Sequence, residues 1–196
     1  MKKIAITGGI GSGKSTVLNI LREKGYVVFS CDEIYKNVIM SKEYIEEIER
    51  YFPQSIKDGE IDRKILSEIV FSSDEKRELL NSIAHPFIIK RLFEEIAKIN
   101  SNLVVVEVPL LFEANLETKF DEIIIVLRGD EDRIKAVCER DKTPSESVLQ
   151  RINSQFDYRS LKENKRIQNC HAHILKNDTT IERLVEKVNA ILDNIK

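Results

Sequence analysis

Several classes of protein are excluded by what the sequence has little of. It contains only 7 glycines and 4 prolines in 196 residues, so it is not a low-complexity or fibrous chain. Hydrophobic residues make up 42% and charged residues 33%, a balance that excludes a disordered or membrane-embedded protein. The length suffices for one compact domain with a sizeable core, or for a core that carries small appendages.

Cysteine is scarce and unpatterned. Cys31, Cys138 and Cys170 are odd in number, widely spaced and free of any C-x-x-C pair. This argues against a disulfide framework and against a zinc site, and it favours a reducing compartment.

Long apolar runs are also missing. None approaches the ~18 residues of a membrane-spanning helix. The stretch before Gly8 has two lysines and only three apolar residues, which is too short for the core of a signal peptide. Together with the cysteines, this predicts a cytoplasmic protein without membrane contact.

The chain has no strong excess of charge of one sign. Its net charge is −2 and its pI is near 6.0, so nothing in the overall electrostatics predicts a nucleic-acid partner. An anionic ligand would therefore need a local cationic pocket. The composition leaves the oligomeric state open, a monomer included.

Apolar patterning predicts an α/β fold. Short apolar runs, typical of strands buried on both faces of a parallel sheet, lie at 4–7, 26–29, 103–108, 123–127 and 172–175. Helical spacing lies at 14–24, 33–40, 42–52, 62–71, 74–99, 131–141, 145–168 and 180–195. Pro86 is expected to break or kink the helix near His85. Alternating strands and helices predict a five-stranded parallel sheet with helices on its faces.

The spacing of these elements predicts the domain organisation. The long segment between the second and third strands exceeds what one crossover helix needs, so 31–100 is interpreted as a helical substrate-binding insertion. Residues 140–168 form a second, basic excursion, interpreted either as a mobile lid or as an ordinary solvated helical face. Its cations are Arg140, Lys142, Arg151, Arg159, Lys162, Lys165 and Arg166. The nucleotide-binding core is then 1–30, 101–139 and 169–196.

Four of the glycines cluster within residues 8–13. Residues 8–15, with the sequence GGIGSGKS, match G-x-x-x-x-G-K-S/T in full. Such a loop wraps backbone N–H groups around a polyphosphate, in conformations that side chains obstruct. The helix that follows points its positive N-terminus at the phosphate. Lys14 should reach the β- and γ-phosphates of a nucleotide, and the Ser15 hydroxyl should bind Mg²⁺. The alternative is a glycine-rich turn that binds nothing.

A phosphate loop indicates a nucleotide but not a reaction. Asp32 lies just past the second strand, on the edge of the sheet where ligands gather. It is either a base that accepts a proton from an attacking hydroxyl or the cap of the helix predicted to begin near Glu33.

Sequence blocks in order along almost the whole chain resemble the dephospho-coenzyme A kinase family of P-loop kinases. They are residues 6–15 with Asp32, then Asp62-Arg63, Leu66, Val70-Phe71, Ala84-His85-Pro86, Val108–Glu113, Arg140-Asp141, Gln150-Arg151-Ile152, Gln155 and Asn177. The Pro109–Glu113 block beside a complete phosphate loop is the specific part. The resemblance implies transfer of the ATP γ-phosphoryl group, with Mg²⁺, to the ribose 3′-hydroxyl of dephospho-coenzyme A, which yields coenzyme A and ADP.

The resemblance also implies roles for individual residues. The implied catalytic residues are Asp32 as general base, Lys14, and Arg140 as a lid arginine. The implied nucleotide site consists of Thr7, Gly8, Gly9, Gly11, Ser12, Gly13, Lys14, Ser15, Thr16 and Asn177, with Asn177 near the adenine. The implied acceptor site consists of Asp32, Arg63, His85, Pro109 and Leu110.

The chain departs from the family pattern at two positions. Ser30-Cys31-Asp32 stands where the family often has Asp-Ala-Asp, and Glu107 stands where it often has Asp.

Three alternative functions remain open at this point. The first is another small-molecule or nucleoside-monophosphate kinase, and the second is a non-catalytic nucleotide-binding module. The third is a GTPase switch, which is disfavoured because Asn164-Lys165 is not followed by the x-Asp of a guanine-reading motif.

Overall fold

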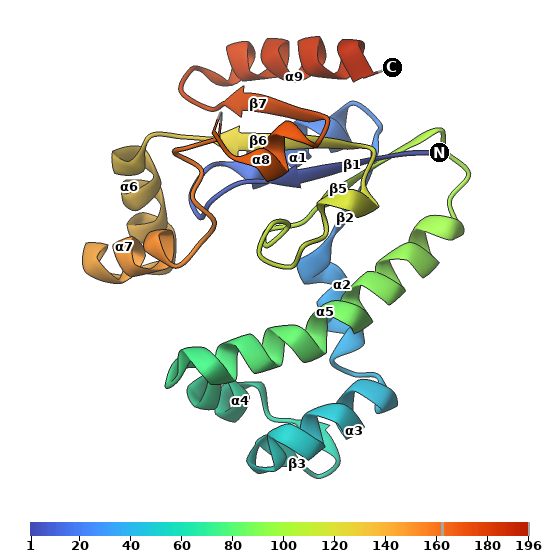
Figure 1. The fold of residues 1–196 in the computed structure, drawn as a ribbon, viewed down its shortest axis with the longest axis vertical. Helices are drawn as coiled ribbons and strands as arrows, with labels where there is room; N and C mark the ends of the chain where they lie inside the picture. Colours follow the sequence, from blue (N-terminus) through green and yellow to red (C-terminus); the bar gives the residue numbers. More distant parts are fainter. Residues whose placement is uncertain (162, 196) are drawn as a thin grey trace. The chain divides into compact units, whose positions relative to one another are not determined.

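A computed structural model gives the fold and describes residues 1–161 and 163–195 (Figure 1). Lys162, one of the cations of the basic excursion, lies outside the described residues. The chain divides into two compact units. Met1–Val28 and Ser101–Lys196 form the core unit, and Phe29–Asn100 form the helical unit.

A five-stranded sheet organises the core unit. Its strands are β1 (Lys2–Thr7), β2 (Val27–Ser30), β5 (Leu103–Glu107), β6 (Glu122–Leu127) and β7 (Ala172–Lys176), in the spatial order β2-β5-β1-β6-β7. β1 pairs in parallel with both β5 and β6, and β6 pairs in parallel with β7. The predicted α/β class with a five-stranded parallel sheet is confirmed, and every strand lies within two residues of its predicted bounds.

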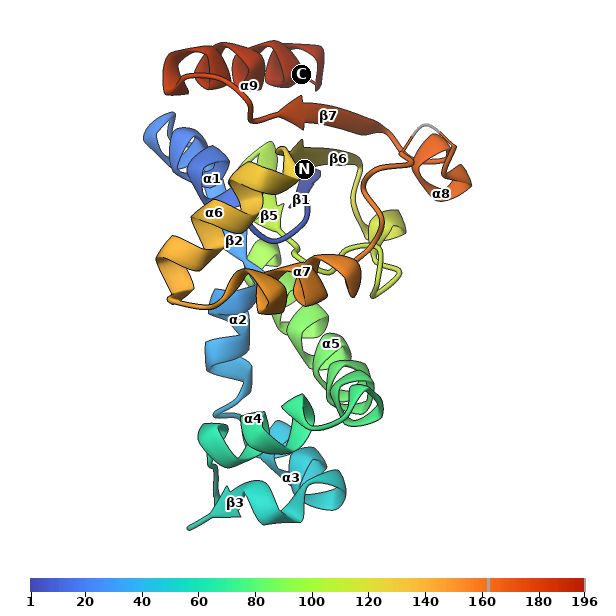
Figure 2. The same ribbon diagram turned by 90° about the vertical axis from the view of Figure 1, so that its left-hand side faces the viewer.

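The helices α1 (Lys14–Glu23) and α9 (Ile181–Ile195) share one hydrophobic core with the sheet. Side chains from both helices, such as Leu21 and Leu192, are buried there with Ile4 and Ile6 of β1. α6 (Asp130–Asp141) and α7 (Ser145–Asn153) lie side by side in Figures 1 and 2, and they bury a small cluster of their own, Val137, Val148 and Ile152.

The helical unit contains α2 (Cys31–Val38), α3 (Lys42–Tyr51), α4 (Arg63–Phe71) and α5 (Asp74–Ala97). α5 packs against the other three helices. Tyr44 is fully buried at their junction, with ring centroids 5.9 Å from Tyr35 and 5.3 Å from Phe87. The longest helix is α5, yet no helix of the described chain combines the length and the apolarity that a bilayer crossing requires.

A short hairpin in the helical unit was not predicted. β3 (Ile56–Lys57) and β4 (Glu60–Ile61) pair antiparallel around Asp58 and Gly59, whose φ angles are 51° and 79°. An Asp-Gly pair suits a turn in which both central residues have positive φ. The Asp58-Gly59 dipeptide is the sequence signal from which this hairpin could have been predicted.

The prediction of one helix over 145–168 is wrong. α7 ends at Asn153 and the short α8 (Lys165–Gln168) begins only after a loop. Within that loop the Asp157 carboxylate accepts a hydrogen bond from the Arg159 N–H at 2.9 Å, and the Asn164 side chain caps α8. Such side-chain contacts offer the backbone an alternative to helix.

Of the two outcomes expected at Pro86, a break or a kink, the break does not occur. α5 runs through the proline, although Figure 1 shows a change of direction along the helix. Buried residues on both sides of the proline, Ile83, Ala84, Leu92 and Ile96, hold the helix in place. Their packing offsets the ~3 kcal/mol that proline costs within a helix.

Leu21→Ala should destabilise the core unit, because Leu21 is fully buried between α1 and the sheet. The expected loss in the free energy of unfolding is about 2–5 kcal/mol. Urea unfolding measures it, with exposed Glu23→Ala on the same helix as control, expected to stay within about 0.5 kcal/mol. Equal effects of the two substitutions would contradict the assigned core.

His85 should make stability depend on pH. It is half-buried in α5, and burial lowers its pKa below the usual 6.5. Above about pH 6.5 the histidine is neutral in both the folded and the unfolded chain. As pH falls, the unfolded chain binds the proton first, so the free energy of unfolding decreases between about pH 6.5 and the lower pKa of the folded state. From about pH 7.5 to 5.5 the free energy of unfolding of the wild type should therefore decrease relative to that of His85→Gln. Exposed His171→Gln is the control, and parallel curves for wild type and His85→Gln would exclude this coupling.

Candidate active site

The glycine-rich loop lies between β1 and α1, as predicted. Gly13 occupies the position before α1 with φ 93° and ψ 24°, a left-handed conformation that glycine adopts without strain. The N–H groups of Thr16 and Val17 donate to its carbonyl, which starts the helix. The N-terminus of α1 therefore opens directly onto the loop, the arrangement that binds anions.

Side chains from other elements lie very close to two of the glycines. A Cβ at Gly9 would overlap the Arg133 guanidinium, and a Cβ at Gly13 would overlap the Asn177 side-chain amide. The loop is therefore held close by neighbours on two sides, and its glycines permit that approach.

The side chain of Lys14 lies over the loop. Its Nζ donates hydrogen bonds to the carbonyls of Gly8 at 2.8 Å and Gly9 at 3.1 Å. Ser15 and Thr16 follow in the first turn of α1, with Ser15 exposed. The Ser12 Oγ is buried and has no hydrogen-bond partner among the described residues.

Thr7 and Asn177 are both brought to this loop. Thr7 is buried at the end of β1, and its Oγ1 lies 3.2 Å from the Tyr158 hydroxyl. Asn177 follows β7, where its N–H donates to the Leu127 carbonyl at 2.8 Å. Its Nδ2 donates to the Ser12 carbonyl at 3.0 Å, so the end of β7 is fastened to the phosphate loop.

Three residues at the loop received no role from the sequence. Arg133 is 8% exposed and donates from Nε to the Ile10 carbonyl at 2.9 Å. Gln155 accepts from the Ile10 N–H at 2.8 Å. Tyr158 reaches Thr7, and its burial raises its pKa well above the usual value. The available signal for Arg133 was its position one turn before the buried Val137, on an apolar helix face.

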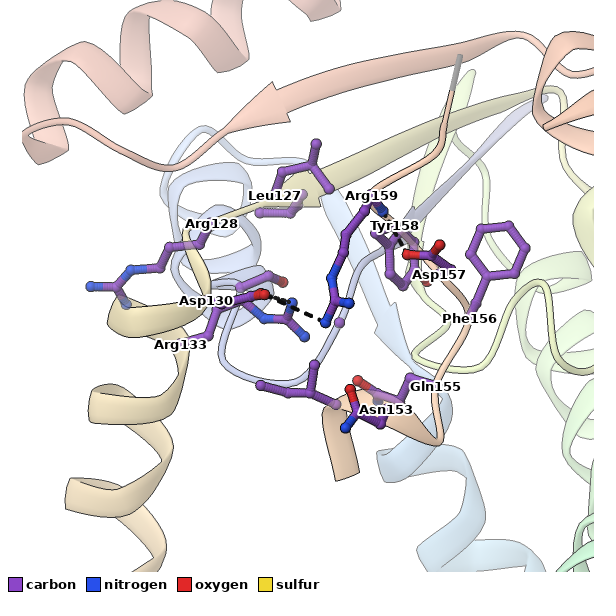
Figure 3. Close-up of a pocket in the computed structure, with 14 residues that line it drawn as sticks. Leu127, Arg128, Asp130, Arg133, Asn153, Gln155, Phe156, Asp157, Tyr158 and Arg159 are labelled. Atoms are coloured by element: carbon purple, nitrogen blue, oxygen red, sulfur yellow. Dashed lines mark hydrogen bonds and ion pairs between the residues drawn. The ribbon is translucent and has the colours of Figure 1, made fainter. Parts of the chain in front are cut away.

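A cavity of ≈ 200 Å³ opens beside Gly9 and Ser12 (Figure 3). Its lining includes three arginines and two aspartates, namely Arg128, Arg133, Arg159, Asp130 and Asp157. The Arg159 guanidinium lies 3.5 Å from Asp130. The excess of arginine gives the loop the local cationic surroundings that an anionic ligand needs.

Arg140 is not among the residues that line this cavity. It lies in the last turn of α6, where its guanidinium donates to both oxygens of Asp141 at 2.7 and 3.0 Å. This ion pair raises the pKa of Arg140. Arg128, Arg133 and Arg159, but not Arg140, are among the residues that line the cavity beside the loop. A substrate contact by Arg140 stays a prediction.

The block after β5 is fastened to the same region. Leu111 and Phe112 are buried, whereas Pro109 and Leu110 are partly exposed. The Phe112 ring stacks on Phe156, with centroids 4.4 Å apart. Glu113 accepts from the Phe156 N–H at 2.9 Å. The Pro109–Glu113 block therefore supports the segment that carries Gln155 and Tyr158.

The remaining predicted residues belong to the helical unit. α2 begins at Cys31 with Ser30 at its N-cap position, so the alternative that Asp32 caps this helix is wrong. Asp32 is exposed in the first turn of α2, and exposed Arg63 is the first residue of α4. His85 is half-buried in α5.

A family comparison covers nearly the whole chain. Residues 2–192 match the dephospho-CoA kinase family. The chain is 38% identical to a dephospho-CoA kinase of Fusobacterium nucleatum, over 98% of this chain and 97% of that protein.

Solved structures are similar too. A crystal structure from Thermus thermophilus has a TM-score of 0.81 at 34% identity, and covers 100% of this chain and 98% of that one. Dephospho-CoA kinase from Campylobacter jejuni has a TM-score of 0.67 at 27% identity, with the same coverage. The chain belongs to the dephospho-CoA kinase family.

Proposed function

We propose that this protein transfers the γ-phosphoryl group of ATP to the ribose 3′-hydroxyl of dephospho-coenzyme A. The products are ADP and coenzyme A, so the reaction completes coenzyme A synthesis. The observation that carries the proposal is an intact phosphate loop, with Lys14 over it, in a chain that matches this kinase family from residue 2 to residue 192.

The loop binds the polyphosphate of ATP through backbone N–H groups and the N-terminus of α1. Lys14 then exchanges the carbonyls of Gly8 and Gly9 for phosphate oxygens, which are stronger partners for an ammonium. Phosphoryl transfer needs little covalent help from a protein, so catalysis here is positioning and charge stabilisation. Arg133 and Arg159 supply further positive charge at the cavity beside Gly9.

The donor set fits Mg²⁺ delivered with ATP. Ser15 offers a hydroxyl at the start of α1. Within the described residues, no three His, Cys, Asp or Glu side chains come together as a metal cage. This suits an ion that keeps several waters and takes its other ligands from phosphate oxygens. Bound there, Mg²⁺ would neutralise charge on the β- and γ-phosphates.

Asp32 is the proposed general base. As an ionised carboxylate it accepts the proton of the 3′-hydroxyl while that oxygen attacks the γ-phosphorus. The side chain of Asp32 is exposed and therefore accessible to a substrate. Asp32 lies within the first turn of α2 and is not the N-cap residue of that helix.

Other predicted residues complete the proposal. The helical unit binds the acceptor through Arg63 and His85, with Pro109 and Leu110 contributed by the block after β5. Asn177 lies by the adenine, and Arg140 belongs to a lid over 140–168. The three cysteines are free thiols, which supports a reducing cytoplasm as the place of the reaction.

A coupled assay of ADP release tests the acceptor. With ATP and Mg²⁺, dephospho-coenzyme A should support turnover, whereas adenylates and shikimate should support little above the rate without acceptor. Preferential turnover of an adenylate would identify a nucleoside-monophosphate kinase instead. Nucleotide binding without turnover of any acceptor would identify a binding module.

Asp32→Asn should lower kcat by roughly 10²–10⁴ while the affinity for ATP is retained, since the amide cannot take the proton. Single-turnover kinetics and ATP titration measure the two quantities. Glu33→Gln, an exposed neighbour on α2, is the matched control and should retain kcat. A full rate for Asp32→Asn would place the base elsewhere.

A further inference from the structure

The backbone of Ile10, at the centre of the phosphate loop, is held on both of its polar groups. Its N–H donates to Gln155 Oε1 at 2.8 Å, and its carbonyl accepts from Arg133 Nε at 2.9 Å. The two contacts come from different elements. Arg133 lies in α6, and Gln155 follows the end of α7.

The side chain of Ile10 is held by the same elements. It packs against the cluster Val137, Val148 and Ile152, which joins α6 to α7. The α6–α7 pair therefore holds one residue of the loop at its donor, its acceptor and its side chain.

The two hydrogen bonds to the Ile10 backbone fix the conformation of the loop on either side of Ile10. A hydrogen bond at the N–H orients the peptide that joins Gly9 to Ile10, and one at the carbonyl orients the peptide that joins Ile10 to Gly11. Gly9 also approaches Arg133 so closely that a Cβ would overlap the guanidinium. Glycine has more conformational freedom than other residues, so contacts from outside the loop help to keep it in one conformation.

Arg133 is suited to be that support. It is a buried cation, and its Nη1 donates to Asp130 at 2.9 Å while Nε serves Ile10. A planar guanidinium holds two acceptors in fixed directions, which a lysine ammonium does not. Asp130 keeps a second partner in Arg159 at 3.5 Å, so loss of Arg133 does not leave that carboxylate unpaired.

We propose that Arg133 and Gln155 are positioning residues that hold Ile10, so that the phosphate loop keeps its phosphate-binding shape before nucleotide arrives. This rests on the proposed function only in that the loop binds a nucleotide. It follows that nucleotide binding and the α6–α7 pair are coupled. A movement of α6–α7 as a lid either carries Ile10 with it or breaks these contacts.

Calorimetric titration with ADP and Mg²⁺ tests the proposal without any acceptor. Arg133→Met keeps the aliphatic stem, and Gln155→Leu keeps the volume, so neither leaves a large cavity. Each should weaken ADP binding roughly tenfold, because the loop must then be ordered at the expense of binding. The double variant should lose less than the product of the two factors, since either substitution alone releases Ile10.

Two matched variants and one further measurement separate positioning from general stability. Gln155→Glu keeps the acceptor for the Ile10 N–H and should bind ADP more tightly than Gln155→Leu when both are titrated at high salt, which screens the added charge from the phosphates. Lys135→Met, an exposed cation on the same helix, should bind ADP like wild type. Thermal unfolding of every variant in the absence of ADP reports stability alone.

A lowered Tm with unchanged ADP affinity would show that the contacts serve only the fold and would overturn the proposal. The proposal would also be overturned if the two factors multiplied in the double variant, or if Gln155→Glu bound ADP as weakly as Gln155→Leu at high salt. The acceptor assay is independent: if dephospho-coenzyme A is not phosphorylated while ADP binding follows this pattern, the proposed function fails and the positioning role stands.

Discussion

The close approach of neighbouring side chains to the glycine loop is the constraint on which the site depends. The Arg133 guanidinium lies against Gly9 and the Asn177 amide lies against Gly13, so closely that a Cβ at either glycine would overlap that side chain unless it moved. Glycines at these positions leave room for the supporting side chains and keep the backbone open to a polyphosphate. The supports come from α6 and from the segment after β7, which are remote from the loop in sequence.

The parallel sheet brings these parts together. Because the strands are parallel, their carboxyl ends lie at one edge of the sheet. The segments that build the site follow the last residues of β1, β5, β6 and β7, which are Thr7, Glu107, Leu127 and Lys176. The central place of β1 puts the phosphate loop between the segments after β5 and after β6. The fold thus supplies the geometry, and loop chemistry supplies the function.

The sequence predicted the elements whose signal is local. The glycine spacing and Lys14 predicted the loop, and the short apolar runs predicted each strand of the five-stranded sheet within two residues. The predictions failed where side chains compete with the backbone, as at Asp157 and Asn164, which interrupt the helix predicted over 145–168. Arg133 and Gln155 could not be given roles, because their partner Ile10 is more than a hundred residues away in the chain.

The central claim is that Lys14 and the loop around it bind the phosphates of the nucleotide. A crystal structure with ADP and Mg²⁺ tests it most directly. The account predicts that the β-phosphate lies within residues 8–15 and that Lys14 Nζ has left the carbonyls of Gly8 and Gly9 for a phosphate oxygen. A bound nucleotide with its phosphates outside the loop, and with Lys14 still on those two carbonyls, would contradict it.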